Sequence, residues 1–193
     1  MNTTKSQFLP RQSLSKTTFV KIRAFVAYNF WEKIQVQYLL FLFAFFAAIQ
    51  SGISQIVINE ICPKNNTVAE DEFGEFPDWI ELYNTSGNDF NIGGYFLSDD
   101  STNLQKWQFP NLLIDSGKNY VVFPDDRDTF WVRPHTNFKL SQEGETIFFS
   151  DPNGDLIEQI SYTKLQADHS FGRFPDGGPD WRFVDEPTWL LYT

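Results

Sequence analysis

Acidic side chains are the groups in this sequence that are best suited to bind a ligand. They concentrate in three polar segments, residues 63–78, 98–103 and 124–128. Calcium takes six to eight oxygen ligands, and loop carboxylates often supply them. The favoured interpretation of the acidic loops is an ordinary solvated surface, with calcium binding as the alternative, and no other cofactor is expected. The predicted metal ligands are Asp71, Glu75, Asp78, Asp99 and Asp100.

The two histidines do not suggest a metal or catalytic site. His135 and His169 are 34 residues apart, and neither has a second ligand two or four positions away. Zinc sites need His, Cys or carboxylate ligands at matched spacing, so each histidine is predicted to be a turn or strand-end residue. The sequence also lacks a Gly-x-Ser-x-Gly nucleophile elbow. We therefore predict no catalytic residues and expect that the protein is not an enzyme.

Three tryptophans are candidates for ligand stacking or for core packing. Trp79, Trp107 and Trp181 each fall within a strand pattern or directly after a turn. Large aromatic side chains at such positions favour burial, so core packing is predicted. Cys62, the only cysteine, follows an apolar run and is predicted to be a small buried hydrophobe.

The elements that carry these residues have the pattern of short strands. Apolar and β-branched runs alternate with turn residues every 8–12 positions, and no helical stretch is apparent after residue 55. Glu60 and Glu81 lie inside such strands, so we expect them to accept hydrogen bonds from loop backbone. The predicted strands are 56–61, 78–84, 90–97, 106–109, 120–123, 136–140, 145–150 and 156–162, with a hairpin turn at 142–144. This spacing predicts an all-β domain, an immunoglobulin-like β-sandwich or a barrel.

Charge is distributed unevenly along the chain. Of 15 Lys+Arg and 25 Asp+Glu, six basic residues and one acidic residue precede residue 55. The rest of the chain therefore has 9 basic and 24 acidic residues, a net charge of −15. Such a domain repels polyanions, so nucleic acid is excluded as a partner.

Residues 1–54 have the layout of an export leader. A basic region precedes the apolar run YLLFLFAFFAAI at 38–49, and small and polar residues follow it. This order is typical of a signal peptide, with an uncleaved N-terminal anchor or a buried core helix as alternatives. We expect an exported protein, extracellular or at the cell surface, with its domain at 55–193 and membrane contact only through the apolar segment.

Six segments of this domain, taken in order, resemble the lamin tail domain family. They are VINEI at 57–61, DWIELYN at 78–84, GYFLSDD at 94–100, KWQFP at 106–110, HTNFKLS at 135–141 and FGRFPDG at 171–177. The resemblance implies an immunoglobulin-like sandwich and brings no catalytic residues with it. In the family's bacterial, exported form, the domain is an accessory module of secreted or surface proteins. The nuclear role of lamins is not implied, because the sequence has no heptad run.

The resemblance and the leader together predict a non-enzymatic secreted or cell-surface module for binding or adhesion. Its partner would be an extracellular protein or glycan. Two alternatives remain: an accessory domain of a truncated secreted enzyme, and an N-terminally anchored structural protein of the envelope.

Overall fold

The computed structural model describes residues 31–35, 37–38 and 55–188. The chain divides into two units, residues 1–53 and 54–193. In the first unit, residues 31–35 and 37–38 are helical. No helix within the described ranges has the length and apolar character needed to cross a membrane. Apart from Tyr38, the predicted apolar run lies outside the described residues.

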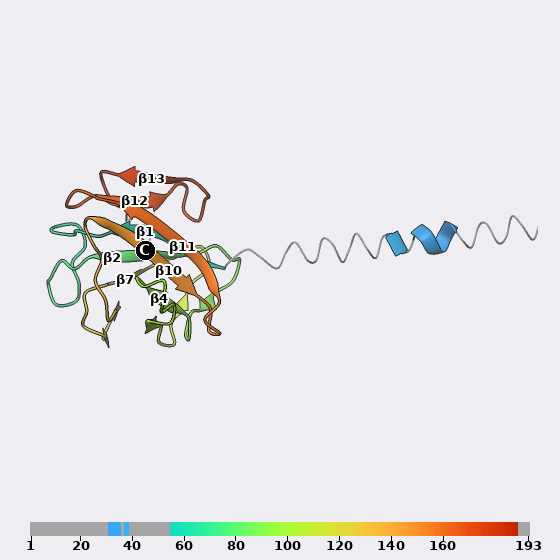
Figure 1. Cartoon of the computed structure of the whole chain (residues 1–193), viewed down its shortest axis with the longest axis horizontal. Helices are drawn as coiled ribbons and strands as arrows, with labels where there is room; N and C mark the ends of the chain where they lie inside the picture. The colour runs from blue at the N-terminus through green and yellow to red at the C-terminus, as the bar shows by residue number, and fades with distance from the viewer. Residues whose placement is uncertain (1–30, 36, 39–54, 189–193) are drawn as a thin grey trace, which may run out of the picture. The chain divides into compact units, whose positions relative to one another are not determined.

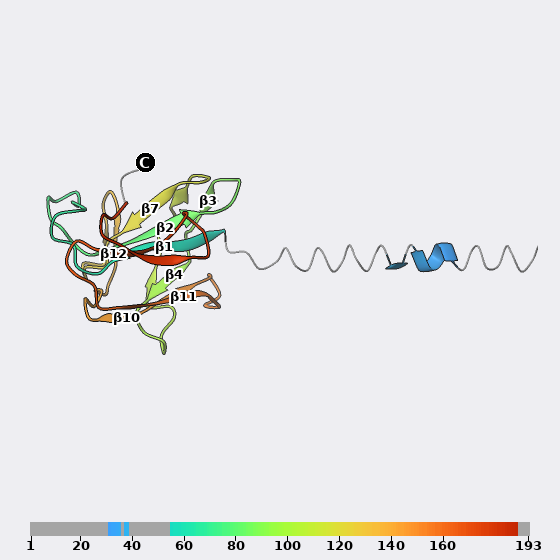
Figure 2. The same ribbon diagram turned by 90° about the horizontal axis from the view of Figure 1, so that it is seen from above.

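The second unit is a sandwich of two antiparallel sheets, which Figure 2 shows as two layers. The first sheet has the order β13-β12-β1-β2-β7, with β1 Ile56–Cys62, β2 Trp79–Asn84, β7 Asn119–Val122, β12 Ser170–Arg173 and β13 Trp181–Val184. The second has the order β11-β10-β4-β5, with β4 Phe96–Ser98, β5 Trp107–Gln108, β10 Gly144–Ser150 and β11 Leu156–Thr163. The predicted all-β, immunoglobulin-like sandwich is confirmed.

Two small sheets complete the described strands. One pairs β3 with β6, and the other is a hairpin of β8 and β9. Their bounds are β3 Phe90–Asn91, β6 Leu113–Ile114, β8 Thr129–Phe130 and β9 Pro134–His135.

The main core lies between the two large sheets, where alternate residues of each strand face inward. Ile80 and Leu82 of β2 point into this core, and Trp107 joins them from β5. Trp79 is also fully buried, as predicted, but it belongs to a second, smaller cluster. Trp181 is only half-buried and stacks on Phe171, with 5.1 Å between the ring centroids.

The second cluster lies on the outer face of the first sheet. It contains Cys62, Ala69, Trp79, Val121 and Phe123, all buried. Ala69 comes from the polar segment 63–78, so this segment packs onto the sheet and closes over Trp79. Cys62 is buried as predicted, and burial raises the pKa of its thiol to about 12.

A β-bulge in β1 shapes the rest of this outer face. The register between β1 and β2 shifts between Ile58 and Glu60, so Asn59 is the extra residue. The Asn59 amide donates to Glu81 Oε1 at 2.8 Å and accepts the Gly177 N–H at 2.9 Å. The bulge therefore ties the C-terminal residues of the domain to the middle of the sheet.

The two strand glutamates are acceptors in different ways. Glu60 accepts the Thr188 backbone N–H at 3.3 Å and the Thr188 hydroxyl at 2.7 Å, and it also accepts the Ser170 hydroxyl. Glu81 accepts from the Asn59 side chain. The predicted backbone bond is therefore present at Glu60, whereas the Glu81 bond comes from a side chain.

Several strands differ from the prediction. The predicted strand 90–97 is divided into β3 and β4, which belong to different sheets. Residues 136–140 do not pair with 145–150, because β10 pairs with β11 and β4 instead. Thr136 is held outside a regular ladder, since its N–H bonds Phe123 O at 2.9 Å and its hydroxyl bonds Phe138 O at 2.9 Å. Strands β12 and β13 were not predicted, although they supply one edge of the first sheet.

Candidate functional site at the loop end of the sandwich

Two loops meet at one end of the sandwich. The first, residues 63–78, joins β1 to β2, and the second, residues 124–135, follows β7 and contains the β8–β9 hairpin. Cys62 pairs with Trp79, and Ile80 pairs with Val122, so both loops leave the same end of the first sheet. We call this the loop end; loop 63–78 lies at the left of the domain in Figure 1.

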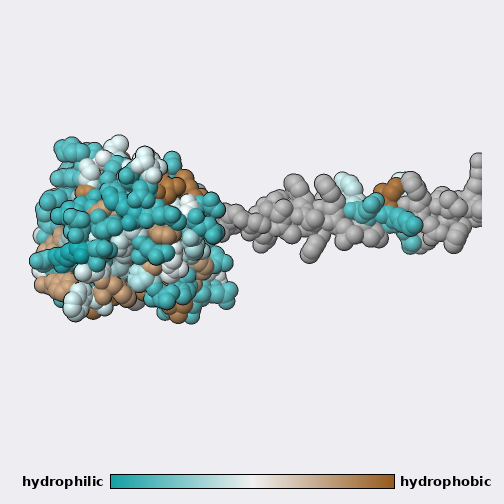
Figure 3. Space-filling view, turned by 60° about the horizontal axis from the view of Figure 1, so that its bottom comes forward, coloured by the Kyte–Doolittle hydropathy of each residue, from teal (hydrophilic) through white to brown (hydrophobic). Residues whose placement is uncertain are grey.

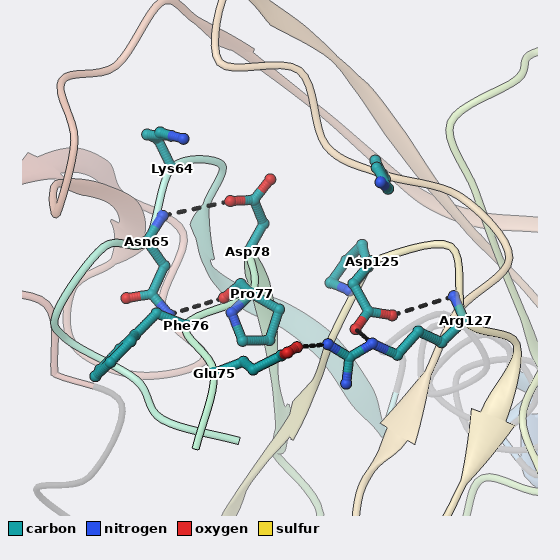
Figure 4. A pocket seen from close by; sticks show the side chains of 10 residues that line it. Lys64, Asn65, Glu75, Phe76, Pro77, Asp78, Asp125 and Arg127 are labelled. Carbon is teal, nitrogen blue, oxygen red and sulfur yellow. Dashed lines mark hydrogen bonds and ion pairs between the residues drawn. The ribbon is translucent and has the colours of Figure 1, made fainter. Parts of the chain in front are cut away.

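Arg127 connects the two loops through three carboxylates. Its Nη1 lies 3.2 Å from Asp71 Oδ2, its Nε lies 3.0 Å from Asp125 Oδ2, and it also pairs with Glu75. Figure 4 shows the guanidinium between Glu75 and Asp125. The guanidinium also lies 5.3 Å from the centre of the Phe73 ring. One cation therefore compensates the acids of both loops and packs against an aromatic side chain.

Asp71 shapes the first loop. Its side chain is fully buried, and its Oδ1 accepts the N–H groups of Phe73 at 2.9 Å and Glu75 at 2.8 Å. Its other oxygen pairs with Arg127. These bonds fix the tight turn that presents Phe73.

His135 and Glu72 form a second link between the loops. His135 is completely buried, with Nδ1 2.7 Å from Asp125 Oδ2 and Nε2 3.6 Å from Glu72 Oε2. Glu72 Oε1 accepts the N–H groups of Val132 at 3.1 Å and Arg133 at 3.4 Å. Burial raises the pKa of Glu72, but these backbone bonds and His135 outweigh it and leave the pKa below its usual value. Glu72 thus holds the turn of the β8–β9 hairpin as an ionised acceptor.

Asn65 organises the start of the first loop. Its side-chain oxygen accepts the N–H groups of Val68 at 3.0 Å and Ala69 at 3.1 Å. Its amide donates to Ala69 O at 2.6 Å and Pro77 O at 2.7 Å. The loop is therefore folded around one amide, which holds Ala69 against Trp79.

A polar cavity of about 310 Å³ lies beside Arg127. Figure 4 shows its lining, which includes Lys64, Glu75, Asp78 and Asp125. Burial raises the pKa of Asp78 to about 6, although the Asn65 N–H and Lys64 act against this rise. The lining of the cavity thus contains both cationic and acidic groups, so neither sign of charge is alone in it.

A group of exposed apolar side chains lies at the loop end. They are Phe73, Phe130, Trp131 and Val132, and we call them the aromatic tip. Trp131 is 71 % exposed and meets Phe73 edge to face, with 6.3 Å between the ring centroids. Figure 3 shows a largely hydrophilic surface interrupted by separate hydrophobic patches. Large exposed aromatic side chains on a fixed frame are typical of a recognition surface.

The five predicted calcium ligands are not gathered at one place. Asp71 and Glu75 share Arg127, and Asp78 lines the adjoining cavity. Asp99 pairs with Lys106 at 2.6 Å, in the turn after β4. Asp100 accepts the backbone N–H and hydroxyl of Thr102, at 2.8 and 2.7 Å.

A different trio has the spacing of a metal site. Ligand atoms of Asp71, Asp125 and His135 all lie within 4.8 Å of one another. The guanidinium of Arg127 already contacts both carboxylates, so it provides the positive charge that an ion would bring. Calcium binding stays a prediction.

Sequence reasoning did not identify Arg127, His135 and Glu72 as one network. The available signal was the run Asp125-Asp126-Arg127-Asp128, in which one cation stands among acids. Its partners on the first loop are more than fifty positions away in the sequence, and only the fold brings them together.

A model of the Lamin Tail Domain family matches residues 49–164 of the chain. The match covers more than half of the 193 residues and includes both loops of the site. No curated protein matches the chain.

Proposed function

The chain belongs to the lamin tail domain family, and from this premise we propose that it is a non-enzymatic, exported binding module. The proposed binding surface is the aromatic tip. The observation that carries the proposal is the combination of four exposed apolar side chains with a buried ionic frame that fixes the two loops beneath them. Binding sites are often found on loops that a rigid scaffold positions.

The chemistry beneath the aromatic tip supports binding better than catalysis. His135 is fully buried between two carboxylates, which is unsuitable for a group that exchanges protons with a substrate. Asp71 already forms an ion pair with Arg127 and accepts the Phe73 N–H in the turn. The Cys62 thiol is buried, and its raised pKa keeps it protonated near neutral pH. These groups hold structure in place.

Export is proposed from the leader. The basic region followed by the apolar run 38–49 is the layout of a signal peptide or N-terminal anchor. The first residue of β1 lies at the end of the sheet opposite the loop end, because Ile56 pairs with Asn84 and Cys62 with Trp79. The aromatic tip is therefore at the opposite end of the first sheet from Ile56.

A ligand screen tests the proposed function. The full chain is applied to arrays of extracellular proteins and glycans, beside the variants Trp131→Ala and Phe183→Ala. Phe183 is 60 % exposed on β13, so it is a matched aromatic control. We expect ligands that are lost with Trp131→Ala and kept with Phe183→Ala. If every ligand bound both variants equally, the aromatic tip would not be the binding surface.

A further inference from the structure

We propose that the aromatic tip recognises a basic, apolar segment of another protein. This inference rests on the proposed function and names the chemistry of the partner. It is carried by two observations at the loop end, an excess of acidic charge and the exposed ring of Trp131.

The loop end carries more acid than its internal partners compensate. Residues 63–78 and 124–135 contain three Lys+Arg and eight Asp+Glu, a net charge of −5. Arg127 forms ion pairs with Asp71, Glu75 and Asp125. Glu72 accepts hydrogen bonds from backbone N–H groups. The remaining exposed carboxylates form no ion pair within the described part of the chain; they are Glu70, Asp126 and Asp128. Their charge is available to a cationic partner.

Asp126 and Asp128 are both exposed and share an unusual backbone conformation. Their φ angles are 69° and 49°, in the left-handed region that disfavours most side chains. Their N–H groups bond Phe138 O at 3.2 Å and Thr136 O at 3.1 Å, which fixes this conformation. The backbone that carries the two carboxylates is therefore held in place, a few residues before Phe130 and Trp131 in the sequence.

The exposed aromatic rings are the second feature that suits a basic partner. A lysine or arginine binds favourably over the face of a tryptophan ring. The domain already makes this contact internally, since Arg127 lies over Phe73 and Arg173 lies 4.8 Å from the centre of the Trp181 ring. The apolar part of a partner segment would cover Phe130 and Val132, which are 48 % and 68 % exposed.

Charge favours this partner over others. The domain has a net charge of −15 after residue 54, so a basic segment is attracted to it from a distance and an acidic one is repelled. A neutral glycan would stack on Trp131 but would gain no attraction between opposite charges from the free carboxylates. The inference therefore predicts an affinity that falls as salt concentration rises.

The test measures binding of three probes to the full chain by titration. The probes are a peptide of Lys, Leu and Gly, the same peptide with Glu in place of Lys, and a neutral oligosaccharide. We expect the basic peptide alone to bind. Trp131→Ala is expected to weaken it about tenfold, as at interface hot spots.

The role of the free carboxylates is tested with the double variant Asp126→Asn, Asp128→Asn. Asparagine tolerates the left-handed region and keeps the size of the side chain. We expect this double variant to weaken the basic peptide several-fold and to flatten its salt dependence. Its matched control is Asp115→Asn with Asp155→Asn, two exposed acids outside the two loops of the site, which should bind like the wild type. Equal weakening by both pairs would mean that only net charge matters, and the inference would be wrong.

The other outcomes separate the inference from the proposed function. If the oligosaccharide or the acidic peptide binds and Trp131→Ala abolishes it, the aromatic tip is a binding surface and the inferred partner class is overturned. If the basic peptide does not bind, the inference fails, whereas the ligand screen still decides the proposed function.

Discussion

Glu60 and Glu81 lie opposite each other on β1 and β2, and both are buried. Burial raises the pKa of both carboxyls, and that of Glu81 reaches about 8. Their mutual repulsion adds to the rise at Glu81, while the hydrogen bond from Asn59 acts against it. At neutral pH Glu81 is therefore a protonated acid within a sheet.

This protonation predicts a pH-dependent stability. Between the unfolded value of 4.5 and about 8, the folded protein keeps a proton on Glu81 that the unfolded chain releases. Its contribution is fully present below pH 4.5 and is lost as pH rises through 8. Each pKa unit corresponds to about 1.4 kcal/mol. We expect Glu81→Gln to flatten the free energy of unfolding over this range and to make the variant more stable than the wild type at alkaline pH.

Denaturant titrations at several pH values measure this effect. Glu186→Gln is the control, because Glu186 is exposed. Other acids with raised pKa values, Asp78 among them, add to the slope, so Glu81→Gln should remove part of it. Identical slopes in the wild type and in Glu81→Gln would show that Glu81 is ionised in the fold.

Trp79→Ala is expected to cost about 3–5 kcal/mol in unfolding free energy, as for other emptied aromatic core sites. Trp79 fills the second cluster beneath loop 63–78, with Ala69 and Phe123 against it. Trp131→Ala is the paired control and should change stability by less than about 0.5 kcal/mol, because Trp131 is a surface residue. A small loss in the Trp79 variant would contradict its place in this cluster.

Arg127→Gln is expected to destabilise the domain by about 1–3 kcal/mol, since it leaves the buried carboxylate of Asp71 and the mostly buried carboxylate of Asp125 without their cation. Thermal melting measures the loss. Lys164→Gln removes the exposed pair with Glu143 and should cost no more than about 1 kcal/mol. If the two variants melted alike, the Arg127 network would not hold the loops.

The same variant gives a test of calcium. Without the guanidinium, Asp71 and Asp125 lose their cationic partner, and carboxylate oxygens are ligands of the kind that calcium takes. We expect calcium to raise the melting temperature more in Arg127→Gln than in the wild type, compared with magnesium and sodium at equal ionic strength. Equal shifts for the three salts would identify simple screening.

Residues 1–54 are predicted to be dispensable for folding. Expression of 55–193 alone should give one cooperative thermal transition, since every described strand lies within it. Mass spectrometry of the exported protein should find a mature N-terminus near Gln55 if the leader is cleaved. A broad, non-cooperative transition would show that the leader contributes to the fold.

The sequence predicted the parts of the fold that depend on local pattern. Alternation around Trp79 gave β2, and the run 56–61 gave β1. It did not predict the bulge at Asn59, because a bulge depends on the partner strand. Nor did it predict β12, whose partner β1 lies more than a hundred positions away.

The candidate site was only partly predicted, because it too depends on contacts between residues that are far apart in the sequence. The acids of loop 63–78 were recognised by composition, but their use depends on Arg127 and His135 from the other loop. Composition shows that charges exist and not which charges meet. The aromatic tip was missed because Phe73 and Trp131 are unremarkable in separate segments, and only the fold places them together.

The pairing of β1 with β12 also governs when the domain can form. Glu60 pairs with Gly172, and Ile61 with Phe171, so one edge of β1 has no partner until the last part of the domain is available. During synthesis the first sheet therefore stays incomplete until residues 170–173 have left the ribosome. Long-range pairing of this kind slows folding. Such a late closure is compatible with the export proposed above, in which the chain would pass a translocation channel before it folds.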